Sequence, residues 1–100
     1  MFHIIENIHK GKTTLRHYRP DWLEGLEIDI YIPDEKIGFE YQGIQHFKPV
    51  EHWGGIAQLK KQQEHDARKK QLCEVHDIKL ICISCYENLT YEHILQRIQS

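Results

Sequence analysis

Residues 24–47 read EGLEIDIYIPDEKIGFEYQGIQHF and predict a β-hairpin with two unlike faces. Apolar side chains alternate along both halves in the period-2 pattern of half-buried strands, at Leu26, Ile28, Ile30, Ile32, Ile37, Phe39 and Tyr41. Residues 33–36, Pro-Asp-Glu-Lys, have the composition of a turn. With Asp34 and Glu35 as the two loop residues, every cross-strand pair has residue numbers that sum to 69.

The polar face of this hairpin gathers carboxylates. The register places Asp29 opposite Glu40, and Glu27 opposite Gln42. Directly opposed residues hold their Cβ atoms about 4.5–5.5 Å apart, and like charges at this separation destabilise the sheet. A divalent cation between Asp29 and Glu40 would reverse that cost, so the pattern predicts a metal site. The alternative is the solvated side of an ordinary amphipathic hairpin, although such a face usually mixes both signs of charge.

Length and composition indicate one globular domain that spans residues 1–100. The chain is 40% hydrophobic and 28% charged, which is typical of a folded protein and not of a disordered one. No apolar run approaches the roughly 20 residues that a membrane helix needs, and the N-terminus lacks the pattern of a signal peptide. We therefore expect a cytoplasmic protein without a membrane partner.

The charge distribution is more informative than the net charge of −2. Residues 21–41 carry a net charge of −6, whereas residues 1–20 and residues 57–70 each carry +3. An acidic centre between two basic segments suits metal-dependent chemistry on a polyanion such as DNA. Two solvated basic helices would give the same distribution.

Periodicity outside the hairpin predicts the remaining elements. Apolar spacing and turn residues indicate a short helix near residues 2–10, a connection over 13–21, a loop over 43–55, a long helix over 56–75, an apolar strand over 78–83 and a last helix that starts at Asn88 or Thr90. The strand is nearly all apolar, so we expect it to be central or covered on both faces. The predicted fold is a compact α/β domain with the order α-β-β-α-β-α and a short mixed sheet flanked by helices.

The long helix carries polar residues on the side that should face the sheet. Leu59 and Cys73 lie fourteen residues apart on one stripe, with Asp66 midway between them and Gln62 one turn earlier. A helix that packs through Leu59 and Cys73 therefore directs Asp66 inward. A buried charge needs a partner or a metal, so Asp66 belongs either to a functional centre or to a structural pair, for example with Arg68.

The spacing of these carboxylates resembles a known nuclease signature. Asp29, ten intervening residues and then Glu40-Tyr41-Gln42 resemble the PD-(D/E)xK motif, with Gln42 in place of the usual Lys. The continuation through His46 is similar to the E-x-D-G-x-x-H segment of the very-short-patch repair endonuclease branch, which includes phage and intron-associated homing endonucleases. The resemblance covers roughly residues 1–85, and its specific part is residues 28–46. The zinc-binding cysteine cluster of the mismatch-repair members is missing from this sequence.

This resemblance implies a restriction-endonuclease-like fold and a Mg²⁺-dependent (or Mn²⁺-dependent) endonuclease that hydrolyses phosphodiester bonds, with double-stranded DNA as the expected substrate. Asp29 and Glu40 would hold the metal, because Mg²⁺ prefers oxygen ligands. Gln42 would orient water or metal but cannot supply charge. His46 is therefore the candidate general base or acid, unless it is an ordinary histidine of a surface loop.

Further residues complete the predicted site. Asp66 would lie at the centre, and Glu6, on the first helix, could add an outer ligand or face solvent. The predicted contacts to DNA phosphates are Lys60, Lys61, Lys69 and Lys70.

One hundred residues leave no room for a dedicated sequence-reading module, so we expect a homodimer or a fused or partner DNA-recognition domain. The main alternative is a non-catalytic nucleic-acid-binding or assembly module that keeps the nuclease fold. A small metalloprotein that uses the histidines is a third, although no tight ligand spacing such as H-x-x-x-H on a helix supports it.

Overall fold

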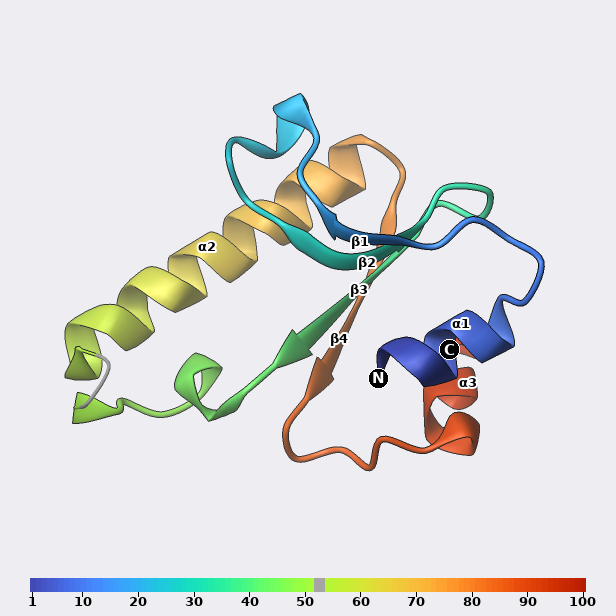
Figure 1. Ribbon diagram of the computed structural model, residues 1–100. Helices are drawn as coiled ribbons and strands as arrows, with labels where there is room; N and C mark the ends of the chain where they lie inside the picture. The colour runs from blue at the N-terminus through green and yellow to red at the C-terminus, as the bar shows by residue number, and fades with distance from the viewer. Residues whose placement is uncertain (52–53) are drawn as a thin grey trace.

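The computed structural model describes residues 1–51 and 54–100, which form an α/β fold with a four-stranded mixed sheet and three α-helices (Figure 1). The elements in chain order are α1 (Phe2–Ile8), β1 (Leu15–Tyr18), the 3₁₀ turn η1 (Asp21–Leu23), β2 (Ile28–Ile32), β3 (Ile37–Gln42), the 3₁₀ turn η2 (Ile44–His46), α2 (Gly55–Val75), β4 (Lys79–Ser84) and α3 (Tyr91–Gln99). The predicted loop over 43–55 contains η2, and its residues 52–53 lie outside the described residues.

The predicted hairpin register is confirmed for the three residue pairs nearest the turn. Strands β2 and β3 are antiparallel and pair Ile30 with Phe39, Tyr31 with Gly38 and Ile32 with Ile37. In each pair the residue numbers sum to 69, as the turn composition predicted. The turn over residues 33–36 is closed by two backbone hydrogen bonds, from Glu35 N to Ile32 O and from Lys36 N to Pro33 O, both 3.3 Å long.

The predicted element order is wrong at residues 13–21, which were expected to be a connection. Residues Leu15–Tyr18 form β1, which pairs antiparallel with β2, so the order is α-β-β-β-α-β-α within the described residues. This strand lies at the edge of the sheet, and three of its four residues are exposed. A short edge strand buries little apolar surface, so no apolar alternation marks it in the sequence.

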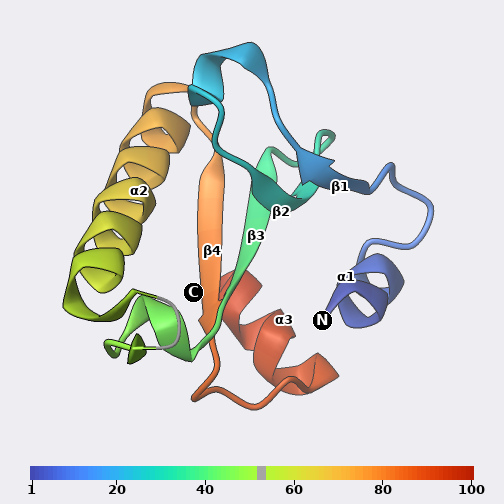
Figure 2. The ribbon, with the colours of Figure 1, turned by 60° about the vertical axis from the view of Figure 1, so that its left-hand side comes forward.

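Strand β4 is parallel to β3 and forms the other edge of the sheet, whose order is β1-β2-β3-β4. Of the two predicted alternatives, a central strand or a strand covered on both faces, the structure confirms the second. Figure 2 shows α2 on one side of β3 and β4, with α3 on the other side. The carboxyl ends of the parallel strands β3 and β4 both lie beside η2, on the side of the sheet nearest the start of α2 (Figure 1).

The two faces of the sheet carry separate apolar clusters. The cluster under α1 and α3 consists of Ile5, Ile30, Ile32, Ile37, Phe39, Ile81, Ile83 and Ile94. The cluster under α2 and η1 consists of Leu23, Ile28, Tyr31, Cys73 and Ile78. None of the helices in residues 1–51 and 54–100 has the length and apolar character that crossing a membrane requires.

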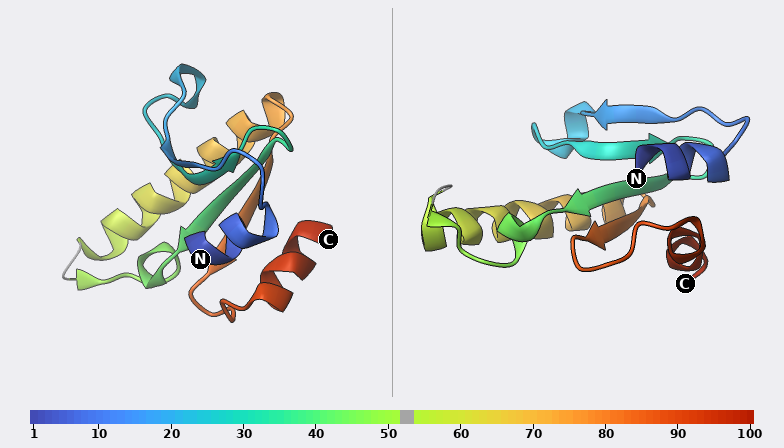
Figure 3. Two further views of the ribbon diagram at one scale, coloured as in Figure 1. Left: turned by 45° about the vertical axis from the view of Figure 1, so that its right-hand side comes forward. Right: turned by 60° about the horizontal axis from the view of Figure 1, so that its bottom comes forward.

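The predicted apolar face of the hairpin is wrong at its open end, away from the turn. Ile28 belongs to the cluster under α2 and not to the cluster of Ile30 and Ile32. Strands β1 and β2 run at a steep angle across β3 and β4 (Figure 3). Strand β2 therefore pairs with β3 only over Ile30–Ile32, next to the turn, and its earlier residues lie away from β3. Ile28 turns toward Gly38, where an added Cβ would lie only 3.1 Å from Ile28 Cγ2. Tyr41, which the register places opposite Ile28, is 40% exposed.

Candidate functional site

Helix α2 presents a polar stripe to the sheet. From Leu59 onward its partly or fully buried residues recur every three or four positions and end with an adjacent pair: Leu59, Gln62, Asp66, Lys69, and then Leu72 and Cys73. The predicted inward orientation of Gln62 and Asp66 is confirmed, since both are half-buried on this stripe. The ends of the stripe are apolar and its middle is polar. The polar middle of the stripe buries little apolar surface against the sheet. Polar groups in such a position are typical of a ligand-binding or catalytic site.

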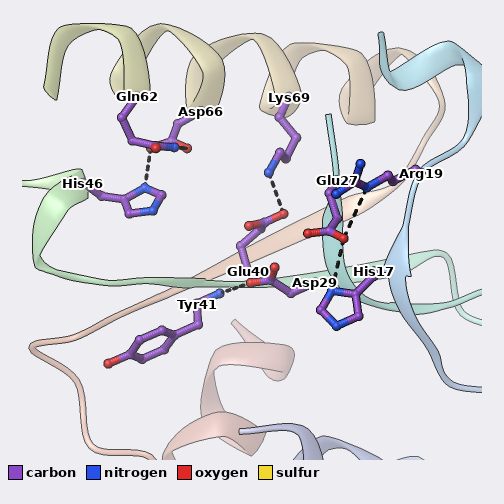
Figure 4. Close-up of polar contacts among 10 residues, drawn as sticks. All are labelled: His17, Arg19, Glu27, Asp29, Glu40, Tyr41, His46, Gln62, Asp66 and Lys69. Atoms are coloured by element: carbon purple, nitrogen blue, oxygen red, sulfur yellow. Dashed lines mark hydrogen bonds and ion pairs between the residues drawn. The ribbon is translucent and has the colours of Figure 1, made fainter. Parts of the chain in front are cut away.

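Glu40 is the buried carboxylate of the sheet. It lies on β3, only 6% of its surface is exposed, and its side chain points toward α2 (Figure 4). Lys69 Nζ donates a hydrogen bond of 2.8 Å to Glu40 Oε1, and the Lys69 side chain is itself only 13% exposed. The pair therefore joins β3 to the polar stripe of α2 with a contact that is almost shielded from solvent.

Asp29 lies beside Glu40 where β2 separates from β3 (Figure 4). Its Oδ2 accepts a hydrogen bond of 2.9 Å from the backbone N–H of Tyr41. The carboxylate thus takes the place of a strand partner at the point where the β2–β3 pairing ends. The side chain of Asp29 is held by the backbone of the neighbouring strand, close enough to Glu40 for its charge to raise the pKa of the Glu40 carboxyl.

The pKa of Glu40 is raised from 4.5 to about 7. Burial is the main cause, because it disfavours the charged form, and the negative charge of Asp29 adds to the rise. The Lys69 ammonium lowers the pKa of Glu40 but does not outweigh burial. The site therefore holds a carboxyl that exchanges its proton close to neutral pH, as many functional carboxyls do.

This raised pKa predicts how stability depends on pH. The unfolded chain loses the Glu40 proton near pH 4.5 and the folded chain near pH 7, so the folded state binds more protons in between. The free energy of unfolding should therefore fall as the pH rises through this window, by on the order of 2–3 kcal/mol from this one group. Urea denaturation of the wild type and of Glu40→Gln at about pH 5 and about pH 8 measures the difference. Equal pH slopes in the two proteins would contradict it.

A second polar contact joins η2 to α2. His46 Nδ1 lies 2.8 Å from Asp66 Oδ2, and Gln62 Nε2 donates to Asp66 Oδ1 over 3.3 Å (Figure 4). Because the carboxylate accepts, Nδ1 carries the proton and Nε2 of the neutral ring is left as an acceptor. The His46 side chain is only 11% exposed and contacts α2, so the alternative of an ordinary surface-loop histidine does not hold.

The alternative of an Asp66–Arg68 pair is also wrong. Arg68 instead donates to both carboxylate oxygens of Glu24, on the exposed side of the molecule. Asp66 thus fixes the tautomer and the orientation of His46, an arrangement that prepares an imidazole for proton transfer.

Glu6 does not join the site. It is exposed on α1, which packs through Ile5 on the cluster opposite α2. The expectation that Glu6 adds an outer ligand is therefore wrong, because the sheet separates Glu6 from Glu40. The helical spacing of apolar residues predicted which side of α1 is buried, but it carried no information on which face of the sheet α1 covers.

Gln42 and the predicted phosphate-binding lysines have different environments. Gln42 is half-buried at the end of β3, where it pairs with Ser84 of β4. Lys60, Lys61 and Lys70 are exposed on α2 and are free to meet a phosphate backbone. Lys69, predicted to belong to the same group, is turned inward to Glu40. The signal for this was in the sequence, since Lys69 follows Asp66 by three residues and precedes Cys73 by four.

The described residues form no closed metal cage. Among residues 1–51 and 54–100, no group of three or more His, Cys, Asp or Glu side chains lies together as a metal cluster. Mg²⁺ needs less, because it is usually held by one or two carboxylates and keeps several waters. Asp29 and Glu40 can supply those two carboxylates. The thiols near Glu40 are poor ligands, because burial raises the pKa of Cys73 to about 11 and also raises the pKa of Cys82.

Comparison with known proteins finds relatives in viruses. The chain is 44% identical over 75 residues to uncharacterized protein 094L of Frog virus 3 (isolate Goorha), a match that covers 73% of this chain and 45% of the viral protein. It is 35% identical over 75 residues to uncharacterized protein 307L of Invertebrate iridescent virus 6, which covers 63% of this chain and 38% of that protein. The chain thus spans less than half the length of these curated relatives. No family model matches the chain. No solved structure matches it either.

Proposed function

We propose that this chain is a restriction-endonuclease-like, divalent-metal-dependent nuclease that hydrolyses phosphodiester bonds in DNA. One observation carries the proposal. Two carboxylates from neighbouring strands, Asp29 and Glu40, lie beside each other, and α2 directs Lys69 to Glu40 and Asp66 to His46 of η2. Packing alone gives no reason to place so many ionisable groups between a helix and a sheet.

Asp29 and Glu40 would hold the metal, which is expected to be Mg²⁺ or Mn²⁺. A bound divalent cation would supply charge neutralisation for the phosphate and a lower pKa for water. The repulsion between the two carboxylates, which helps to raise the pKa of Glu40, would be relieved on binding. Metal affinity should increase with pH, because the cation competes with the proton of the Glu40 carboxyl.

His46 would move the proton. Its Nδ1–H donates to Asp66, so Nε2 is available to accept a proton from the attacking water, or in the charged ring to donate one to the leaving oxygen. Gln62 holds the other oxygen of the Asp66 carboxylate and so fixes the plane of the pair. Asp66 and Gln62 act through His46 and are positioning residues.

Lys69 would supply the positive charge that Gln42 lacks. Its ammonium already contacts Glu40 at 2.8 Å from α2, in a half-buried position where charge is weakly screened. An ammonium at this place would stabilise the negative charge that develops on the phosphoryl oxygens. Gln42, at the end of the same strand as Glu40, is left to orient water.

Lys69→Met therefore tests the proposal separately from metal binding. We expect the turnover of DNA cleavage to fall by roughly 10²–10³-fold, the usual cost of removing one group that stabilises transition-state charge. The matched control is Lys70→Met, an exposed neighbour that should weaken DNA binding and leave turnover at saturating DNA unchanged. Initial rates of plasmid nicking measure both, and full activity in Lys69→Met would remove Lys69 from the mechanism.

A non-catalytic nucleic-acid-binding module is the second candidate. The observation that favours it is the Glu40–Lys69 pair itself, which neutralises the carboxylate without any metal. Such a protein would bind DNA through the exposed lysines of α2 and would not cut it.

The two candidates differ in two measurements on the wild-type chain. A nuclease should bind Mg²⁺ alone in isothermal titration calorimetry, and it should convert supercoiled plasmid to the nicked form only when Mg²⁺ or Mn²⁺ is present. Plasmid binding without any nicking in either metal would leave the binding module as the function.

A further inference from the structure

Two aromatic rings lie exposed next to His46. Phe47 follows η2 directly after His46, and Tyr86 lies in the loop between β4 and α3. Their ring centroids are 5.5 Å apart with the planes tilted by 60°, although the residues are 39 positions apart in the chain. Phe47 is 39% exposed and Tyr86 is 61% exposed, so neither ring is part of the core. We call these two residues the aromatic pair.

The sheet itself brings the aromatic pair together. Parallel strands β3 and β4 end at the same edge, and Cys85 N donates to Gln42 O over 2.9 Å where the two chains leave the sheet. The Tyr86 backbone N–H then donates to Ser84 Oγ over 3.3 Å, which holds the start of the loop. These contacts hold the two segments that carry the rings next to each other at the ends of β3 and β4.

The aromatic pair is adjacent to the proposed proton-transfer group. The ring centroids of Phe47 and His46 are 6.4 Å apart. A nucleobase stacked on the Phe47 ring would therefore lie close to a phosphate bound at His46. The next residue, Lys48, is exposed and brings a positive charge to the same segment. Aromatic faces with a nearby cation form the usual binding surface for unpaired bases, whose faces stack on the rings while the cation meets the phosphate.

We propose that Phe47 and Tyr86 stack an unpaired nucleobase of the DNA strand, next to the phosphate that His46 would act on. The inference rests on the proposed nuclease function and specifies its substrate class as DNA with an unpaired or single-stranded nucleotide at the cleavage position. In a continuous duplex both faces of every base are covered by its neighbours, so the aromatic pair would have nothing to stack on. The expected preference therefore departs from the duplex substrate that the sequence resemblance implies.

The test measures binding without cleavage. The full chain is titrated, in EDTA, into a fluorescein-labelled oligonucleotide of about 12 nucleotides, either single-stranded or as a blunt duplex, and anisotropy gives the affinity. The wild type should bind the single strand more tightly than the duplex. Phe47→Leu and Tyr86→Leu, which keep an apolar side chain, should each weaken single-strand binding by roughly 5- to 150-fold and leave duplex binding nearly unchanged.

Two controls separate stacking from folding and from general hydrophobicity. Tyr86→Phe keeps the ring and should bind like the wild type. Tyr91→Leu removes an aromatic ring of comparable exposure, 43%, on α3 and should have no effect. Circular dichroism of each variant establishes that the fold is retained.

Two results would overturn the inference. One is an unchanged affinity for the single strand in Phe47→Leu and Tyr86→Leu. The other is a loss of duplex affinity in these variants as large as their loss of single-strand affinity. These outcomes are independent of the nuclease proposal, because no metal is present. Cleavage that depends on Asp29, together with unaltered binding in these variants, would refute the aromatic pair and keep the nuclease. Loss of single-strand binding in a chain that never cuts DNA would keep the pair as a binding surface and refute the nuclease.

Discussion

Asp29→Ala is expected to lower Mg²⁺-dependent nicking of supercoiled plasmid by roughly 10³-fold or more. The charge stabilisation that a metal supplies is worth several kcal/mol, and each 1.36 kcal/mol corresponds to a factor of ten in rate. The Asp29 carboxylate also holds the Tyr41 backbone N–H, so the Ala variant could be impaired for a structural reason. Asp29→Asn keeps an oxygen acceptor for that hydrogen bond and removes the charge, and it should lose activity to a similar degree.

Glu40→Gln provides the complementary experiment, because it should abolish cleavage without destabilising the fold. The raised pKa of Glu40 shows that the folded protein disfavours the ionised carboxylate, in spite of Lys69. A neutral amide of nearly the same shape can still accept from Lys69, so at about pH 8 the variant should be at least as stable as the wild type. Glu74→Gln, an exposed position on the same helix as Lys69, is the control that should change neither property.

Strong destabilisation of the metal-free Glu40→Gln variant would assign Glu40 a structural role. Activity retained in Glu40→Gln would show that the chain cuts DNA by another centre. Calorimetric titration with Mg²⁺ alone tells whether a loss of activity follows a loss of metal binding, which both charge-removing variants should show.

His46→Ala is expected to lower turnover by about 10²–10⁴-fold, the range for a general base or acid. It should leave Mg²⁺ affinity almost unchanged, because this hard cation prefers oxygen to imidazole. If His46 is the base, the wild-type rate at saturating Mg²⁺, where protonation of Glu40 no longer limits metal binding, should fall at acid pH, and the variant should lack this acid limb. If His46 acts only as the acid, the missing limb should be the alkaline one.

Asp66→Asn separates positioning from a merely structural role of this contact. The amide can donate to Nδ1, which would favour the wrong tautomer, with the proton on Nε2. Turnover should therefore fall together with a change in the pH profile, while the affinity for metal and for DNA stays the same.

A His46→Ala variant with full activity would contradict the proposed role of the His46–Asp66 pair. Water oriented by Gln42 would then remain as the proposed means of proton transfer.

The hairpin was predictable because its signals are local. Alternation through Ile30 and Phe39 and a four-residue turn specify a register, and a shift by one residue would send the whole polar set to the other face. The inward side of α2 was predictable for the same reason, since helical geometry relates Asp66 to Leu59 and Cys73 by spacing alone. These two patterns account for Glu40 and Asp66 lying on the same side of the sheet, the side that α2 covers.

What the sequence determined by itself is thus which side chains share a face of one element. Only the tertiary structure decided which faces meet: that β1 adds an edge strand to β2, that α1 carries Glu6 to the far side of the sheet, and that Lys69 reaches Glu40. It also decided that Ile28 leaves the apolar face and packs in the cluster under α2, close to Gly38. The physical reason is that local spacing fixes directions within an element, whereas contacts between elements depend on how all the apolar surfaces are buried together.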